Sequence, residues 1–212
     1  MLFQQLLNLI FPLSCLHCGQ GDELLCVACR ETLILQPQTI PGGTVKTLLV
    51  AADYETPIIQ TLIKAYKYHN LPQLASYLAP LLIQRLQSIP QLPPMEILPI
   101  PLHAKRLRQR EYNQSLLLAQ LVASHFGWKL NSDLRRNKNT SAQARLNREQ
   151  RLHNLDQAFH YTGTSLVGKN VLLLDDVITT GATIEAAAAA LRPHQPDSIW
   201  ALALARNQSL RY

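Results

Sequence analysis

Apolar and polar residues alternate along this chain in blocks that predict strands and helices in turn. Three apolar runs predict buried strands: Val45 to Tyr54, Val171 to Asp175, and Ile199 to Ala205. Apolar residues at helical spacing predict helices over three further segments: Pro57 to Tyr68, Leu71 to about Gln87, and Gln114 to about Phe126. An alanine-rich segment from Ala186 to Leu191 also favours a helix.

A fourth apolar run, Ile97 to Pro101, contains two prolines and predicts a strand with an irregular end or an edge position. Strands that alternate with helices indicate an α/β fold with a doubly wound, mostly parallel sheet. Ligands of such sheets bind beyond the carboxyl ends of the strands. Functional residues are therefore expected where the apolar runs end.

Composition sets the organisation of the chain. Its 212 residues, of which 47% are hydrophobic, suffice for one full α/β domain and a small appendage. We expect an N-terminal part over residues 1–35, a linker rich in proline and glycine over residues 36–43, and the main domain over residues 44–212.

The first thirteen residues, Met1 to Leu13, are mostly apolar and predict an amphipathic helix docked on the body of the protein. They lack the Lys or Arg of a signal peptide, and they are too short to cross a bilayer. A peripheral position at the inner face of a membrane stays open, although no cationic face accompanies the helix. We expect a cytoplasmic protein without an integral membrane segment.

All four cysteines lie in one short stretch with the spacing Cys15-x2-Cys18-x7-Cys26-x2-Cys29. Paired Cys-x-x-Cys knuckles place four thiolates around one tetrahedral zinc, and a closed shell of this kind is structural. Two disulfides in an exported domain and a redox-active Cys-x-x-Cys are the alternatives. His17 lies between the cysteines and is a possible substitute ligand.

The strand that begins at Val171 ends in two adjacent acids, Asp175 and Asp176, and a loop of small residues follows. The loop residues are Thr179, Thr180, Gly181, Ala182 and Thr183. Free backbone N–H groups and hydroxyls at the start of a helix suit a phosphate, whereas paired carboxylates suit two ribose hydroxyls or a magnesium ion. A ribose 5-phosphate satisfies both halves. The alternative is a buried strand that ends in an acidic helix cap and a turn glycine.

Positive charge is concentrated in the middle of the chain. Between His103 and His153 there are eleven Lys and Arg against three Asp and Glu, a net charge of +8 in a chain whose total is +6. A segment this basic expects an anionic partner such as pyrophosphate, a nucleotide or a nucleic acid. Aromatic residues that could stack on bases are scarce near it, namely Tyr112, Phe126 and Trp128.

The stretch from Val171 to Glu185 resembles the 5-phosphoribosyl-1-pyrophosphate (PRPP) motif of type I phosphoribosyltransferases. Further blocks extend the resemblance to the ComF/GntX family: Phe11-Pro12 before the cysteines, Tyr54 with Lys64 and Lys67, Pro99 to Gln114, Thr140 to Asn154, and Ala158-Phe159. Two positions depart from the family pattern. Glu111 stands where the family has glycine, and Lys67-Tyr68-His69 lacks a following glycine.

The resemblance implies residue roles. The acids and the Thr179 to Thr183 loop would bind PRPP with magnesium, and the turn after Pro101, including His103, would hold the pyrophosphate. The segment from Asn139 to Arg151 would close over it as a hood. The implied catalytic cations are Arg106, Arg110 and Arg148, and the implied nucleic-acid contacts are Lys105, Arg108, Arg145 and Arg151. For each arginine, a solvated surface position or a contact with DNA is the alternative.

Two functions stay open on this basis. In the first, the protein is a phosphoribosyltransferase with an unidentified acceptor that acts in natural transformation, during DNA uptake, on incoming single-stranded DNA in the cytoplasm. In the second, it is a non-catalytic protein that binds single-stranded DNA or partners and keeps the PRPP fold as a sensor or scaffold. The resemblance also implies DNA-uptake helicases or recombination proteins as partners, with DNA binding independent of base sequence.

Overall fold

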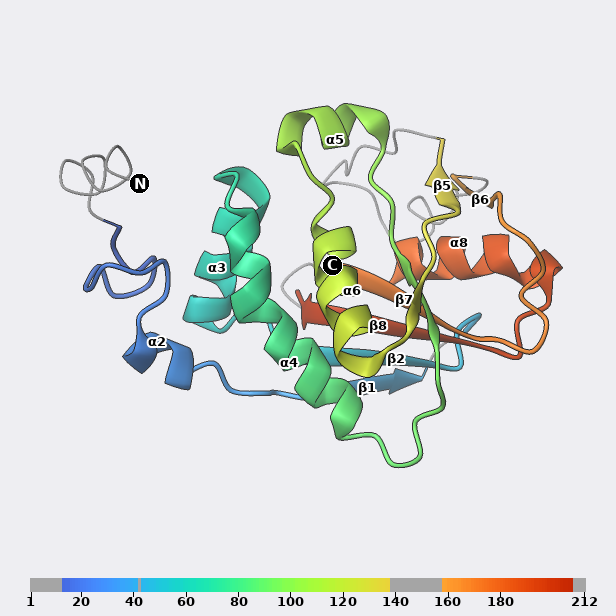
Figure 1. The fold of residues 1–212 in the computed structure, drawn as a ribbon, viewed down its shortest axis with the longest axis horizontal. Coiled ribbons are helices and arrows are strands. Elements are labelled where there is room, and N and C mark those ends of the chain that lie inside the picture. Colours follow the sequence, from blue (N-terminus) through green and yellow to red (C-terminus); the bar gives the residue numbers. More distant parts are fainter. Residues whose placement is uncertain (1–12, 42, 138–157, 208–212) are drawn as a thin grey trace.

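The computed structural model describes residues 13–41, 43–137 and 158–207 (Figure 1). Their main feature is a six-stranded sheet, which in spatial order contains β1 (Gln38–Pro41), β2 (Thr47–Asp53), β8 (Ser198–Arg206), β7 (Asn170–Ile178), β3 (Glu96–Pro99) and β4 (Lys129–Leu130). Every neighbouring pair is parallel except β1 with β2. The predicted mostly parallel α/β sheet is confirmed.

Helices cover both faces of this sheet. One face carries α4 (Ala75–Gln87) and α6 (Gln114–Phe126), next to α3 (Pro57–Tyr68) and the 3-10 turn η1 (Pro72–Leu74). The other carries α8 (Ala182–Leu191), followed by the 3-10 turn η2 (Arg192–His194), and the antiparallel hairpin of β5 (Leu134–Arg136) and β6 (Phe159–Tyr161). The sheet is therefore the middle layer of three (Figure 1).

The period-2 pattern of β7 explains why both faces are covered. Leu172 and Leu174 lie in the core beneath α4 and α6, and Leu173 lies in the opposite core beneath α8. A strand that is apolar on both sides has no face for water, so it needs a helix layer on each side. The doubly wound arrangement follows from this apolar run.

Strand β3 corrects one expectation. It lies between β7 and β4 in the interior of the sheet, with all four residues buried, so the predicted edge position is wrong. The prolines are accommodated because the strand ends at Pro99, and Ile100 then donates its N–H to the carbonyl of Leu174 at 2.9 Å. The irregular end is the part of the prediction that the structure bears out.

The segment expected to be a linker, residues 36–43, contains the edge strand β1. Arg85 of α4 is buried and ties this strand to the body, since its guanidinium donates to the Gln38 carbonyl at 3.3 Å and to the Thr39 hydroxyl at 2.5 Å. Pro41 is compatible with the strand because β1 lies at the edge of the sheet.

The cysteine-containing segment packs against the same core as the sheet. Leu25 is fully buried and belongs, with Cys15 and Cys29, to the apolar cluster that also contains residues of α3, α4 and β2. The short helix α2 (Val27–Glu31) places the guanidinium of Arg30 over the ring of Tyr77 in α4, 4.9 Å from its centroid. The N-terminal part therefore shares its core with the main domain.

Two further expectations concern the start of the chain. Within the described ranges, no helix is long and apolar enough to cross a membrane. The amphipathic helix expected over Met1 to Leu13 lies outside the described residues except for Leu13, which is exposed.

Candidate phosphoribosyl site

The paired acids lie near the carboxyl end of β7, where parallel sheets bind ligands. Asp176 is 6% exposed and forms an ion pair with the ammonium group of Lys67, with 2.9 Å between Nζ and Oδ1. Asp175 is partly buried and accepts hydrogen bonds from the hydroxyl of Ser115 at 3.0 Å and from the backbone N–H of Asp176 at 2.9 Å. Three elements, β7, α3 and α6, thus meet at these acids.

The charge of Asp175 is only partly compensated. Burial, together with the neighbouring Asp176 carboxylate, raises the pKa of Asp175 to about 6, although Lys67 and the Ser115 hydroxyl act in the opposite direction. A carboxylate in this state gains from any additional hydrogen-bond donor or cation. Ribose hydroxyls supply the first, and a magnesium ion supplies the second.

The loop after β7 leads directly into the first turn of α8. Gly181 precedes the helix with a φ of 81°, a left-handed conformation that favours glycine, and no side chain caps the helix there. The hydroxyl of Thr180 accepts the N–H of Ala182 at 3.4 Å. The predicted set from Thr179 to Thr183 therefore lies at a helix N-terminus, next to the two acids in sequence and in space.

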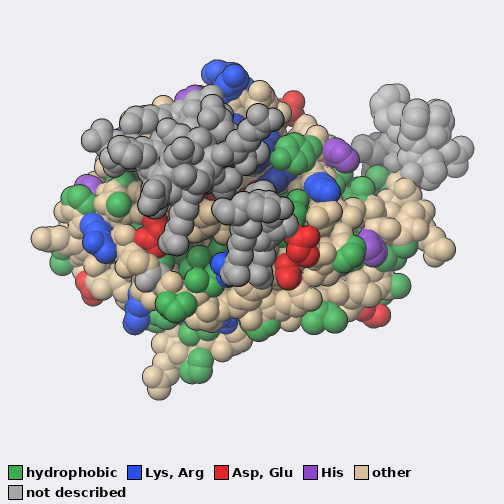
Figure 2. Space-filling model, turned by 180° about the vertical axis from the view of Figure 1, so that it is seen from behind, with side chains coloured by type: hydrophobic (Ala, Val, Ile, Leu, Met, Phe, Trp, Pro, Cys, Tyr) green, Lys and Arg blue, Asp and Glu red, His purple; other side chains and the backbone are tan. Residues whose placement is uncertain are grey.

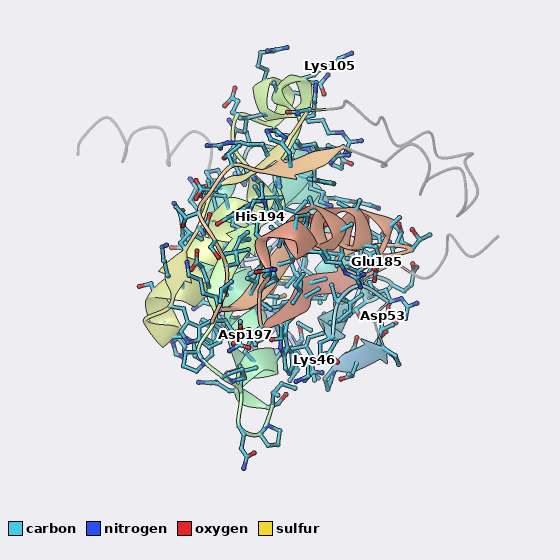
Figure 3. The ribbon with its side chains drawn as sticks, turned by 90° about the vertical axis from the view of Figure 1, so that its right-hand side faces the viewer. Lys46, Asp53, Lys105, Glu185, His194 and Asp197 are labelled. Carbon is cyan, nitrogen blue, oxygen red and sulfur yellow. The ribbon has the colours of Figure 1, made fainter. Side chains whose placement is uncertain are left out.

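The segment after Pro101, expected to be a turn, forms the short helix α5 (Ala104–Arg110). His103 caps it, because its Nδ1 accepts the N–H of Lys105 at 3.2 Å. Four of its seven residues are Lys or Arg, and none is acidic. Figure 3 shows Lys105 at the far end of the molecule from Lys46 and Asp197, which precede β2 and β8.

Glu111 ends α5 in a left-handed conformation, with φ of 65°. This explains why glycine suits the position, and it makes the departure from the family pattern a local strain. The Glu111 carboxylate accepts a hydrogen bond from the side-chain amide of Asn70, which is itself left-handed with φ of 51°. The two unusual residues therefore support each other across the gap between α3 and α5.

Arg110 and Arg106 differ in what they contact. Arg110 donates to the side-chain oxygen of Gln114 at 3.2 Å, and its guanidinium lies 5.5 Å from the ring centroid of Tyr68. Arg106 lies within electrostatic range of Arg136 in β5, and Arg136 in turn lies within range of Asp175. Burial and the neighbouring Arg106 lower the pKa of Arg136, and Asp175 counters this. Arg136 therefore connects the charge of α5 to that of the acids.

Three tyrosines lie within electrostatic range of Asp176. Burial raises the pKa of Tyr54, Tyr66 and Tyr112, and the charge of Asp176 contributes to each shift. The Tyr66 and Tyr112 rings lie 5.5 Å apart, and the hydroxyl of Tyr66 donates to the Gln114 carbonyl at 2.9 Å. The surroundings of the acids thus hold more aromatic residues than the basic segment suggested.

The sequence pattern missed several of these neighbours. Lys67, Ser115 and Arg136 were not predicted to belong to the site, although Lys67 lies in a segment that resembles the family. Only Lys67 could have been found from the sequence, through the Lys67-Tyr68 pair that resembles the family. Contacts between elements far apart in the chain leave no local pattern. The candidates Arg145, Arg148 and Arg151, with the expected hood, lie outside the described residues.

The four cysteines converge as their spacing predicts. Their sulfur atoms all lie within 4.8 Å of one another, and those of Cys18 and Cys26 are 3.6 Å apart. A tetrahedral zinc with bonds of about 2.3 Å fits sulfurs at such separations. Burial and the other three thiols raise the pKa of Cys29, whereas the burial of Cys15 is outweighed by hydrogen bonds to Cys18, Cys26 and His17, which lower the pKa of Cys15 to about 6. A metal binds the deprotonated thiolates, so a bound cation favours ionisation of the whole cluster. The cluster is suited to hold a metal.

Comparison with known proteins gives consistent matches. The family model described as phosphoribosyl transferase domain matches residues 113–212. Competence protein F of Haemophilus influenzae (strain ATCC 51907 / DSM 11121 / KW20 / Rd) is 31% identical over 207 residues, which cover 92% of this chain and 85% of that protein. The DNA utilization protein YhgH of Escherichia coli (strain K12) is 30% identical over 184 residues, which cover 80% of this chain and 78% of that protein.

Among solved structures, adenine phosphoribosyltransferase from Leishmania tarentolae aligns with 81% of this chain and 95% of its own, at 15% identity and a TM-score of 0.40.

Proposed function

The chain belongs to the family of competence protein F and YhgH, and from this premise we propose that it binds PRPP with magnesium and acts on single-stranded DNA during DNA uptake. The observation that carries the proposal is the position of Asp175 and Asp176. They lie near the carboxyl end of a central parallel strand and shortly before a helix N-terminus without a side-chain cap, and Arg136 links Asp175 electrostatically to Arg106 of the basic helix α5.

Each part of this arrangement matches one part of PRPP. The two carboxylates accept hydrogen bonds from the ribose hydroxyls, and the N–H groups and hydroxyls from Thr179 to Thr183 surround the 5-phosphate. Arg106 and Arg110 of α5 stabilise the charge of the pyrophosphate as it departs. Asp175 and Asp176 would help to hold a magnesium ion, which would supply further compensation of the pyrophosphate charge.

The proposed chemistry is transfer of a phosphoribosyl group. The bond between ribose C1 and the pyrophosphate oxygen breaks, the electron pair leaves with the pyrophosphate, and a nucleophilic acceptor forms the new bond to C1. The transition state resembles an oxocarbenium ion, so the enzyme acts mainly through electrostatics and position. Arg148 is proposed as a further cation for this step.

Calorimetric titration with PRPP and magnesium tests the site. We expect the wild-type protein to bind and the Asp175→Asn/Asp176→Asn variant to lose binding while keeping its fold. Asp197→Asn is a suitable charge control, because Asp197 lies beside the N-terminal end of β8 and an Asn oxygen can still accept its hydrogen bond from Gly168. Equal affinity in the wild type and the double variant would remove the acids from the proposed site.

The non-catalytic alternative is favoured by one observation, the concentration of cations on α5 without an acid among them. In that case PRPP acts as a ligand that is sensed and not consumed. Release of pyrophosphate from PRPP, measured with and without single-stranded DNA, separates the two. Stoichiometric binding without pyrophosphate release assigns the sensor role, whereas DNA-dependent release assigns the transferase role.

A further inference from the structure

Tyr68, at the C-terminal end of α3, is unusually open to solvent. With 69% of its surface exposed, it is the most exposed large apolar side chain of the described residues. Tyr66, two residues earlier, is fully buried. An exposed aromatic ring of this size indicates a contact surface when polar groups that suit a ligand surround it.

One face of the Tyr68 ring is already occupied by a cation. The guanidinium of Arg110 lies 5.5 Å from the ring centroid. Its hydrogen bond to Gln114 ties this α5 side chain to α6. The hydrogen bond between Asn70 and Glu111 joins the two elements next to this contact. The ring is therefore held by a cation over one face, and the 69% of the residue's surface that stays exposed is enough for a flat ligand to contact.

This ring lies close to the paired acids. Its neighbour in sequence, Lys67, makes the 2.9 Å ion pair with Asp176. Tyr54 lies within electrostatic range of both Tyr68 and Asp176, which brings the ring into the neighbourhood of the acids. A ligand stacked on Tyr68 would thus be near a phosphoribosyl group held by the acids.

The helix beside the ring carries the charge that a phosphate backbone requires. Lys105, Arg106 and Arg108 share α5 with Arg110, and Lys105 and Arg108 are exposed. Leu107 of the same helix is also 42% exposed. Figure 2 shows Lys and Arg side chains at the top of the molecule, the end at which α5 lies in Figure 1.

We propose that Tyr68, backed by Arg110, is a stacking site for one base of a single-stranded nucleic acid whose phosphates lie along α5. The inference rests on the proposed function and deepens it by naming the residue that receives a base. Every base has a π-face, so stacking combined with phosphate contacts binds without sequence preference. A flat aromatic ring beside a row of cations fits this ligand better than a protein surface or a lipid headgroup, which offers no base to stack.

Photo-crosslinking of the wild-type protein tests the placement directly. The probe is a thymidine oligonucleotide that carries 5-iododeoxyuridine at one position, and the crosslinked residue is identified by mass spectrometry. We expect the principal crosslink at Tyr68. Crosslinks confined to residues outside α3 and α5 would overturn the proposal, and this test does not depend on how any variant folds.

Binding of the same oligonucleotide without iodine, followed by fluorescence anisotropy, tests the energy of the contact. Tyr68→Ala should weaken binding about tenfold, and Tyr68→Trp should restore it, because stacking needs only a flat ring. An oligonucleotide with abasic sites should bind the wild type and Tyr68→Ala equally. Ile34→Ser, which removes another exposed apolar side chain far along the chain, is the control.

Charge is tested separately from stacking. Arg108→Ala should reduce the salt dependence of binding by about one unit of slope, whereas Tyr68→Ala should leave the slope unchanged. Arg192→Ala removes the same charge from the exposed turn η2 and serves as the matched control. If Arg192→Ala reduces the salt dependence of binding as much as Arg108→Ala does, then only the net charge of the protein matters and the phosphates do not lie along α5.

The outcomes separate this inference from the proposed function. If Tyr68→Ala binds the oligonucleotide as the wild type does, or if the folded wild type does not bind it at low salt, the stacking site is wrong. PRPP binding that depends on Asp175 and Asp176 would then stand by itself. If the folded wild type binds neither PRPP nor the oligonucleotide, both proposals are refuted.

Discussion

The ionised carboxylate of Asp175 should lower the free energy of unfolding at neutral pH, and the substitution Asp175→Asn should raise it again. In Asp175→Asn the side-chain oxygen can still accept the hydrogen bonds from Ser115 and from the backbone N–H of Asp176, so the change removes mainly the charge. The folded pKa of about 6 lies above the ordinary value of 3.8, because burial and Asp176 disfavour the ionised form. The folded protein therefore binds this proton more tightly than the unfolded chain.

The sign and size of the effect follow from linkage. Below the ordinary value Asp175 is protonated in both states and contributes no penalty. As the pH rises through both pKa values, the penalty grows to about 3 kcal/mol, from a shift of roughly two units at 1.36 kcal/mol per unit. The gain in Asp175→Asn should be complete near pH 7 to 8 and about half as large at pH 5.

Urea unfolding of the wild type and the variant at a series of pH values between 5 and 8 measures this difference. Asp176→Asn is the matched control, because it removes an acid from the same strand but leaves the largely buried Lys67 without its 2.9 Å ion pair. We expect this control to lose stability by about 1–3 kcal/mol at pH 7. Comparison between variants at one pH cancels any pH dependence that a metal bound by the cysteines would add.

Two results would refute the reasoning on Asp175. One is a loss of stability in Asp175→Asn at pH 7, which would mean that its hydrogen bonds depend on the negative charge. The other is a gain of the same size at pH 5 and pH 8, which would dissociate the gain from ionisation. The expected pattern would show that Asp175 destabilises the fold, as a residue kept for binding a ligand does.

Three further predictions concern other parts of the molecule. Metal analysis of freshly purified, reduced protein should find one zinc per chain, and chelation should lower the Tm of the whole protein, because Cys15, Leu25 and Cys29 belong to the main core; a metal content near zero would contradict the zinc assignment. Arg85→Ala should lower the free energy of unfolding by about 2–3 kcal/mol, since it removes the hydrogen bonds to Gln38 and Thr39, and a change below about 0.5 kcal/mol would show that β1 is held without it. Glu111→Gly should stabilise an Asn70→Ala background by about 1 kcal/mol by relieving the left-handed angle, but should gain less in the wild type, where the hydrogen bond to Asn70 is also lost; equal gains in a double-mutant cycle would exclude that coupling.

Local signals explain which elements the sequence predicted well. Helix α3 begins at Pro57, and α6 begins after the cap Asn113 and ends before Gly127, which has a left-handed φ of 67°. Caps and apolar periodicity are read within a few residues, so the bounds of these helices were predictable. Strand β1 was missed because four residues with two nearby prolines carry no period, and the β5–β6 hairpin because its three-residue strands lie far apart in sequence.

The site shows the same division. The acids and their loop form a continuous motif, so their position at the end of β7 could be predicted. The helical form of α5 was missed because four cations among seven residues obscure any apolar period. Lys67 and Ser115 reach the acids from α3 and α6, and such contacts are decided by packing between elements that are 60 or more residues apart.

Of the described strands, β8 comes last along the chain, yet it lies between β2 and β7. During synthesis, the β1–β2 pair and the strand with the paired acids are therefore complete before the strand that bridges them exists. A nascent chain that stops before Ser198 would present two parallel strand edges without a partner, surfaces that invite association with other chains. Completion of the sheet that carries the paired acids and protection from aggregation thus depend on the same late event in biosynthesis.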